Sequence, residues 1–247
     1  MDYTYSDISK MIDHSLLNPS LTDREMEEGC RLAVRYDVAS ACVKPYFLKR
    51  CAELLASSSV QPSTVIGFPH GGHTTGVKVG EAGQAIRDGG TELDMVVNIG
   101  KVLTEDWAFV RDDILAVVET AHAGGGIVKV IFENCYLQDG HKIRLCEICA
   151  EVGADFVKTS TGFGPGSATP HAVALMVRTV GNVMGVKAAG GIKDYETAVR
   201  YLELGCTRLG VAATVDILEA APDVHEVSPA AGVVSTDGTR EASRVSA

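Results

Sequence analysis

The chain has 247 residues, of which 46% are hydrophobic and 22% are charged, and 26 residues are glycine. This length is typical of one closed α/β barrel, and it also allows about one and a half average domains. The 32 acidic and 22 basic side chains give a formal charge of -10, which argues against a nucleic-acid partner because a phosphate backbone attracts positive charge. No apolar stretch approaches the ~20 residues needed to span a bilayer, so we expect no membrane partner and a cytoplasmic location.

Seven cysteines are scattered along the chain. An odd number, in a chain long enough to build its own core, is typical of reduced thiols in the cytosol. One Cys-x-x-Cys pair, Cys146 and Cys149, falls in a stretch with helical apolar spacing. We interpret this pair as two thiols on one helix face, with a redox or metal pair as the alternative.

Short runs rich in β-branched residues alternate along the chain with amphipathic stretches. The predicted strands are residues 11–13, 39–43, 63–67, 92–97, 127–132, 155–158, 185–188 and 207–211. Helical patterns lie between them at residues 24–36, 80–88, 108–121, 143–151, 170–180 and 195–204. Because strand–helix alternation calls for a parallel sheet, we predict an α/β fold that is a single (β/α)8 TIM barrel. An open doubly wound sheet is the alternative.

Local signals mark two helix starts and one boundary. Thr22 and Glu25 have the spacing of a capping box, and Lys193-Asp-Tyr-Glu196 places acidic residues at the start of another helix. From Pro222 the chain consists largely of Ser, Ala, Val, Gly and Thr without sustained periodicity. We therefore predict one barrel domain over residues 1–221 and a flexible C-terminal tail over residues 222–247.

Charged residues interrupt several predicted strands, namely Asp13, Asp94, Lys129, Lys158 and Lys187. A charge inside a barrel is costly and is seldom found there without a reason. Lys158 and Lys187 fall on adjacent strands, ~4.8 Å apart, and two ammonium groups that close cannot both stay protonated cheaply. One pKa should fall, leaving a neutral amine able to attack a carbonyl, with Asp94 nearby to move protons. The alternative is an ion-pair network that only holds the strands together.

Glycine-rich segments follow the last three predicted strands. Glycine lets backbone N–H groups turn toward a ligand, and the late loops of such barrels commonly hold phosphate. We predict a phosphate site at Gly162, Gly164, Gly190, Gly191 and Gly210, although tight turns alone would explain some of these glycines.

Other chemistries have weaker signals. His70 and His73 lie in a glycine-rich loop without a third ligand in register, which is a weak metal signal. The Gly-x-Ser-x-Gly motif of acyl-transfer enzymes does not occur in the sequence. We therefore predict no metal and no cofactor.

With these residues aligned, the sequence resembles the deoxyribose-phosphate aldolase family, which consists of class I aldolases with a (β/α)8 fold. The matching segments are Ile12-Asp-His-Ser-Leu-Leu17, Cys42-Val-Lys-Pro-Tyr46, Val65-Ile-Gly-Phe-Pro69, Glu92-Leu-Asp-Met-Val-Val-Asn98, Val157-Lys-Thr-Ser-Thr-Gly-Phe-Gly164 and Gly185-Val-Lys-Ala-Ala-Gly-Gly-Ile192. They extend in order over nearly all of residues 10–218, and the last two together are highly specific.

The resemblance implies that Lys158 forms the Schiff base, that Lys187 lowers its pKa, and that Asp94 works with Lys187 in proton transfer. It also implies a supporting role for Asp13 and a place for Cys42 at the border of the pocket. The implied reaction is reversible, metal-independent cleavage of 2-deoxy-D-ribose 5-phosphate to acetaldehyde and D-glyceraldehyde 3-phosphate. The partners would be small-molecule sugar phosphates and aldehydes. A homo-oligomer stays open, since barrels of this kind often pair through exposed helices.

One segment departs from the family pattern. After the last strand, relatives usually carry Gly-x-Ser-Ser beside the phosphate, whereas this chain has Gly210-Val-Ala-Ala-Thr214. Losing two hydrogen bonds to a charged acceptor, each worth ~1.5–3 kcal/mol, weakens phosphate binding by tens-fold or more. Only Thr214 lies near as a replacement donor. The chain also has no tyrosine after Tyr201, whereas some relatives end in a tyrosine that folds over the site.

Two alternatives stand beside the main hypothesis, and the departures motivate the first of them. One is a class I aldolase of the same fold that uses a different or unphosphorylated aldehyde acceptor. The other is a sugar-phosphate-binding protein without catalysis, which would form no covalent adduct at Lys158.

Overall fold

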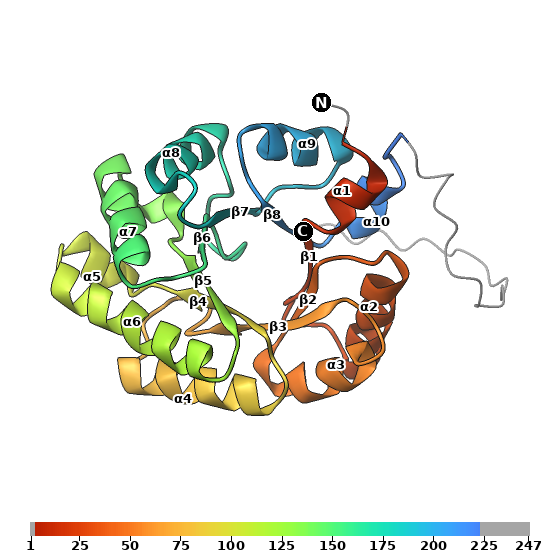
Figure 1. The fold of residues 1–247 in the computed structure, drawn as a ribbon, viewed down its shortest axis with the longest axis horizontal. Coiled ribbons are helices and arrows are strands. Elements are labelled where there is room, and N and C mark those ends of the chain that lie inside the picture. Colours follow the sequence, from red (N-terminus) through yellow and green to blue (C-terminus); the bar gives the residue numbers. More distant parts are fainter. Residues whose placement is uncertain (1–2, 223–247) are drawn as a thin grey trace, which may run out of the picture.

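The computed structural model describes residues 3–222, which form a closed barrel of eight parallel strands (Figure 1). Each strand pairs with its neighbours in chain order, and β1 closes the ring by pairing with β8. The strands are β1 (Ile12–Leu16), β2 (Ser40–Val43), β3 (Gln61–Ile66), β4 (Glu92–Val96), β5 (Ile127–Ile131), β6 (Phe156–Lys158), β7 (Gly185–Ala189) and β8 (Arg208–Val211). The predicted TIM barrel is confirmed, and the doubly wound alternative is wrong.

Helices surround the strands on the outside of the barrel (Figure 1). They are α1 (Tyr5–Ser9), α2 (Asp23–Arg35), α3 (Leu48–Leu55), α4 (Thr75–Arg87), α5 (Ile99–Leu103), α6 (Trp107–Ala123), α7 (Asp139–Glu151), α8 (Pro170–Val180), α9 (Tyr195–Glu203) and α10 (Thr214–Leu218), with 3-10 turns η1 (Pro45–Phe47) and η2 (Asn134–Tyr136). The six predicted helices correspond to α2, α4, α6, α7, α8 and α9. Helix α3 was not among them, and it begins without a capping side chain that would signal its start.

Both predicted helix starts are present. Thr22 and Glu25 form a reciprocal capping box at α2, in which the Glu25 carboxylate accepts the Thr22 N–H at 2.7 Å. At α9 the Asp194 carboxylate accepts the Thr197 N–H at 2.8 Å. These caps satisfy backbone donors that the first turn of a helix leaves free, and they therefore fix the residue at which each helix begins.

The register of the strands brings the charged residues together inside the barrel. Asp94 of β4 lies beside Lys129 of β5, and Lys158 of β6 lies beside Lys187 of β7. Successive residues of a strand point to opposite faces, so the residues between these charged ones face the helices. That outward layer is apolar and fully buried, with residues such as Leu93, Val128, Val130, Val157 and Leu209. The hydrophobic core therefore lies between strands and helices, and the polar groups gather within the ring.

A buried ion pair joins two outer helices. The Lys78 amine of α4 contacts the Asp113 carboxylate of α6 at 2.6 Å and donates to the Val96 carbonyl at 2.9 Å, and Lys78 is fully buried. Removing one partner leaves an uncompensated buried charge, so we expect Lys78→Met to lower the free energy of unfolding by about 3–5 kcal/mol. Urea unfolding followed by circular dichroism measures this loss. The paired change Lys78→Met with Asp113→Leu should recover most of the loss, and an equally unstable double variant would contradict the explanation.

The predicted tail over residues 222–247 lies, apart from Pro222, outside the described residues. Within residues 3–222 no helix has the length and apolar character needed to cross a membrane.

Candidate active site

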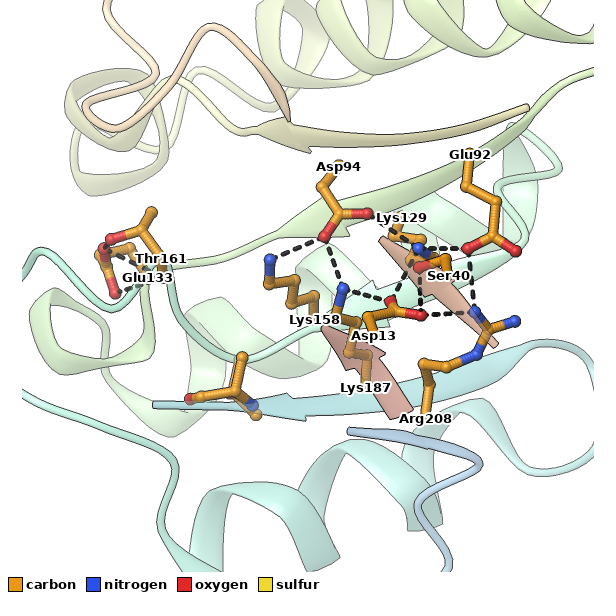
Figure 2. A network of polar contacts seen from close by, with 12 residues as sticks. Asp13, Ser40, Glu92, Asp94, Lys129, Glu133, Lys158, Thr161, Lys187 and Arg208 are labelled. Carbon is orange, nitrogen blue, oxygen red and sulfur yellow. Dashed lines mark hydrogen bonds and ion pairs between the residues drawn. The ribbon is translucent and has the colours of Figure 1, made fainter. Parts of the chain in front are cut away.

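Asp94 holds two lysine amines on one carboxylate oxygen. Its Oδ2 lies 2.7 Å from Nζ of Lys158 and 2.7 Å from Nζ of Lys187, and all three side chains are buried (Figure 2). The lysines come from the neighbouring strands β6 and β7, at paired positions of the register. The structure therefore brings together the three residues predicted to be catalytic, at the distance over which a proton passes between hydrogen-bonded groups.

A second layer of charges lies deeper in the barrel (Figure 2). Asp13 contacts Lys187 and also accepts from Lys129 at 2.9 Å and from Arg208 at 2.6 Å. Glu92 contacts Lys129 at 2.6 Å and Arg208 at 2.9 Å. The predicted supporting residue Asp13 thus contacts one member of the lysine pair, since it accepts a hydrogen bond from Lys187.

The charge balance of this cluster favours a neutral amine at one position. Four cationic side chains face three carboxylates, namely Lys129, Lys158, Lys187 and Arg208 against Asp13, Glu92 and Asp94. Buried charge without compensation is expensive. One cation therefore lacks a full counter-charge, and losing one proton balances the cluster.

Lys158 is the group best placed to lose that proton. Burial lowers the pKa of Lys158, and the positive charge of Lys187 adds to this, while Asp94 opposes it without restoring the ordinary value. Burial also disfavours the charged form of Lys187, but Asp13 and Asp94 outweigh it and raise the pKa of Lys187. Burial alone would raise the pKa of Asp94, yet the three lysines around it hold that pKa well below its usual value. The arrangement places the lysine that loses its proton most readily beside an ammonium ion and a carboxylate.

A cavity of about 660 Å³ opens above the two lysines. Lys158, Lys187, Asp13 and Cys42 line it, whereas Asp94 is fully buried behind the amines. Cys42 is 2% exposed and packs with Leu17 and Val65. Burial raises the pKa of the Cys42 thiol, so it borders the pocket as a protonated, weakly polar side chain.

The glycines predicted to bind phosphate fall into two groups. Gly162, Gly190, Gly191 and Gly210 line the cavity, and the first three have positive φ angles that favour glycine. A Cβ atom on Gly210 would lie 3.0 Å from Cε of Lys187, so glycine there leaves room for the lysine. Gly164 is not part of the lining, and a Cβ atom on it would lie 3.1 Å from the Glu133 carboxyl carbon. Close packing explains that glycine.

The strand-eight segment presents methyl groups to the cavity. Ala212 and Ala213 line it, as the sequence pattern suggested. Thr214 does not line it, because this residue is fully buried and its hydroxyl is 2.8 Å from Nδ1 of His14. Burial lowers the pKa of His14 to about 4, so its neutral ring holds the start of α10. Thr214 therefore does not supply the donor that the two alanines lack.

The weaker sequence candidates lie away from this cavity. Cys146 and Cys149 are buried free thiols on α7, as the interpretation of two thiols on a helix face requires. His70 and His73 are exposed. Among residues 3–222 no group of three or more His, Cys, Asp or Glu side chains is arranged to hold a metal ion.

Comparison with known proteins identifies the family. The model of the DeoC/LacD family of aldolases matches residues 8–214. The chain belongs to this family of aldolases. A deoxyribose-phosphate aldolase of Rhodopirellula baltica is 55% identical over 220 residues, which are 89% of this chain and 91% of that protein.

Solved structures agree with this assignment. The aldolase QR15 has a TM-score of 0.84 at 37% identity and covers 89% of this chain and 98% of its own. A tetrameric deoxyribose-phosphate aldolase of Aeropyrum pernix has a TM-score of 0.82 at 31% identity, covering 88% of this chain and 92% of its own. The resemblance drawn from the sequence motifs is confirmed.

Some polar residues of this aldolase were missed as site residues at the sequence level. Glu92 and Arg208 lie two positions before Asp94 and Gly210, on the same inward faces of β4 and β8. Ser40 of β2 donates to Asp13 at 2.6 Å. Period-two spacing from the recognised residues would have found Glu92 and Arg208. Glu133, which contacts the loop after Lys158 (Figure 2), carries no such signal.

Proposed function

We propose that this aldolase reversibly cleaves 2-deoxy-D-ribose 5-phosphate to acetaldehyde and D-glyceraldehyde 3-phosphate through a Schiff base at Lys158. The observation that carries the proposal is the bridging of Lys158 and Lys187 by one oxygen of Asp94, directly below the cavity. The names of the relatives, which are deoxyribose-phosphate aldolases from several organisms, support this substrate.

The chemistry follows from the neutral amine. Nζ of Lys158 attacks the C1 aldehyde of the open-chain sugar, and loss of water gives an iminium ion. The 3-hydroxyl loses its proton, the C2–C3 bond breaks, and its electron pair flows into the iminium to form an enamine as glyceraldehyde 3-phosphate leaves. A proton added to the enamine carbon regenerates the iminium, and water releases acetaldehyde and the free amine.

Asp94 and Lys187 are the groups that move protons in this scheme. Asp94 accepts hydrogen bonds from both amines, so it can take a proton from the attacking nitrogen and exchange it with Lys187. The charge of Lys187 also favours the neutral form of Lys158 before attack. The iminium ion itself withdraws the electron pair that leaves the C2–C3 bond, and we therefore propose that the reaction is metal-independent.

The phosphate end of the substrate would lie against the glycine-rich rim of the cavity. Gly162, Gly190, Gly191 and Gly210 can present backbone N–H groups there, and Lys193 lines the same cavity with a positive charge. Backbone donors and a cation are the usual ligands of phosphate in such loops. The side chains of Ala212 and Ala213 contribute no hydrogen-bond donor, so recognition of the phosphate depends on the glycine-rich rim and Lys193.

The test is cleavage of 2-deoxyribose 5-phosphate and of 2-deoxyribose in parallel, with released acetaldehyde measured as kcat/KM. We expect a clear preference for the phosphate ester. Because two restored hydroxyls add hydrogen bonds to a charged acceptor, the double change Ala212→Ser and Ala213→Ser should raise kcat/KM for the ester about tenfold. The value for the unphosphorylated sugar should stay unchanged. Equal rates for the two sugars in the unaltered enzyme would instead indicate an unphosphorylated acceptor.

Two further properties belong to the same proposal. All seven cysteines are free, which suits the reducing cytoplasm. We also propose that the chain forms a homo-oligomer, as the tetrameric relative of Aeropyrum pernix does. Exposed apolar side chains on the outer helices, such as Val77 and Leu103, would contribute to such contacts. Light scattering at several protein concentrations measures the oligomeric state.

A further inference from the structure

Glu133 occupies an unusual position between β5 and η2. It is 2% exposed, and its φ of 56° and ψ of 63° lie in the left-handed region that residues other than glycine seldom adopt. The backbone on either side continues to pair with β6, since Phe132 donates to the Lys158 carbonyl and Asn134 to the Thr159 carbonyl. A strained residue between two paired ones persists only where its surroundings hold it.

The Glu133 carboxylate holds the loop that follows Lys158 (Figure 2). It accepts the Thr161 N–H at 3.2 Å from one oxygen and 3.3 Å from the other, and it also accepts the Thr161 hydroxyl. That hydroxyl in turn accepts the Phe163 N–H at 3.0 Å. One carboxylate therefore determines the conformation of three successive residues, Thr161, Gly162 and Phe163.

No cationic side chain among residues 3–222 lies within ion-pair distance of Glu133. Its buried oxygens are satisfied by hydrogen bonds from the loop, so the Glu133 side chain and the loop stabilise each other. The fit is also tight, because a Cβ atom on Gly164 would lie 3.1 Å from the carboxyl carbon of Glu133 and a Cβ atom on Gly166 would lie 2.6 Å from Cβ of Cys135.

The held residues face the substrate cavity while Glu133 does not. Thr161, Gly162 and Phe163 all line the cavity that contains Lys158. Ala212 and Ala213, which line the same cavity, lack hydroxyl donors. A turn that is rigid before binding loses less entropy when it meets an anion.

We propose that Glu133 is a positioning residue for phosphate recognition, acting through Thr161 to hold the turn of residues 161–163 in the conformation that receives the phosphate group. The proposal rests on the proposed function, since it concerns the phosphate end of that substrate. It assigns no chemical step to Glu133, which should affect substrate binding and leave Schiff-base formation intact.

The test compares Glu133→Ala with the unaltered enzyme on 2-deoxyribose 5-phosphate and on 2-deoxyribose. We expect KM for the ester to rise about tenfold, with kcat changed less than about threefold. The kcat/KM for the unphosphorylated sugar should change little, so the preference for phosphate falls. Glu133→Gln keeps an acceptor oxygen for the Thr161 N–H and should recover much of the loss. Borohydride trapping of the acetaldehyde adduct at Lys158 should be unchanged.

Glu81→Ala is the matched control, because the Glu81 carboxylate accepts the Gly67 N–H at 2.7 Å and so holds a different strand-end loop. It should leave the ratio between the two sugars unchanged. Thr161→Val tests whether Glu133 acts through Thr161. If it does, the double variant Glu133→Ala with Thr161→Val should lose no more of the phosphate preference than the more affected single variant. Should Glu133→Ala fail to fold, Thr161→Val must still lower the phosphate preference.

Three outcomes would overturn the proposal. They are an unchanged sugar ratio in Glu133→Ala or, should that variant not fold, in Thr161→Val, additive effects of the Glu133 and Thr161 changes, and an equal loss of preference in Glu81→Ala. Absence of the Lys158 adduct in the unaltered enzyme would instead refute the proposed function, so the two failures are distinguishable.

Discussion

Replacing Lys158 with alanine is expected to lower kcat/KM for 2-deoxyribose 5-phosphate by about 10⁴-fold or more. The amine is the atom that forms the covalent intermediate, and the other polar groups of the cluster cannot substitute for a nucleophile in that position. Lys158→Arg should lower kcat/KM almost as much. A guanidinium group retains the charge beside Asp94 but stays protonated at every accessible pH.

Trapping experiments separate loss of chemistry from loss of structure. Borohydride added with substrate should give one reduced adduct in the unaltered enzyme, located at Lys158 by peptide mass analysis, and none in Lys158→Ala. The variant should still bind the substrate, which equilibrium dialysis measures. An adduct on another lysine would refute the assignment, and binding without any adduct in the unaltered enzyme would favour a non-catalytic sugar-phosphate-binding protein.

Replacing Lys187 with leucine has the second largest expected effect, about a hundredfold on kcat/KM near pH 7. The positive charge of Lys187 is one of the causes that lower the pKa of Lys158. Without it the pKa of Lys158 rises. At a pH below the Lys158 pKa of both the unaltered enzyme and the variant, each unit of rise leaves a tenfold smaller fraction of neutral amine. The rate should therefore increase with pH over a more alkaline range than in the unaltered enzyme.

The pH profile distinguishes this role from a structural one. Lys187→Leu should recover part of its lost activity as the pH rises, because the remaining amine then deprotonates. Lys78→Met also removes a buried lysine, but that residue lies between α4 and α6, so it should lower stability without moving the profile. An unmoved profile in Lys187→Leu would show that Lys187 does not control the pKa of Lys158.

The main features of the site were predictable because they follow from strand periodicity. Charged residues in β-branched runs have to face either apolar helices or the barrel interior, and in a barrel the paired positions of adjacent strands meet. Asp94, Lys158 and Lys187 could therefore be grouped from the sequence alone, and the contacts of Asp94 with both lysines confirm the grouping. The boundaries of α4 and α7 were less accurate, because their first turns lack a strong apolar pattern.

Contacts that depend on loop conformation could not be predicted. Nothing in the local sequence marks Glu133 as left-handed, or Thr214 as turned toward His14 and away from the cavity. Gly164 matched the composition of an anion-binding loop, yet its neighbours Glu133 and Cys135 account for the glycine through close packing. The pairing of Lys78 with Asp113 depends on how α4 and α6 pack, which sequence spacing alone does not specify.

The contact between Asp13 and Arg208 joins the first strand to the last, across 195 positions of the chain. Contacts so distant in sequence form late, because the loop that they close is long. During synthesis and refolding the lysines of β5, β6 and β7 therefore lack the Asp13 carboxylate until β1 and β8 meet. Asp13 raises the pKa of Lys187, and the charge of Lys187 in turn lowers the pKa of Lys158, so the charge environment of Lys158 is complete only in the closed barrel.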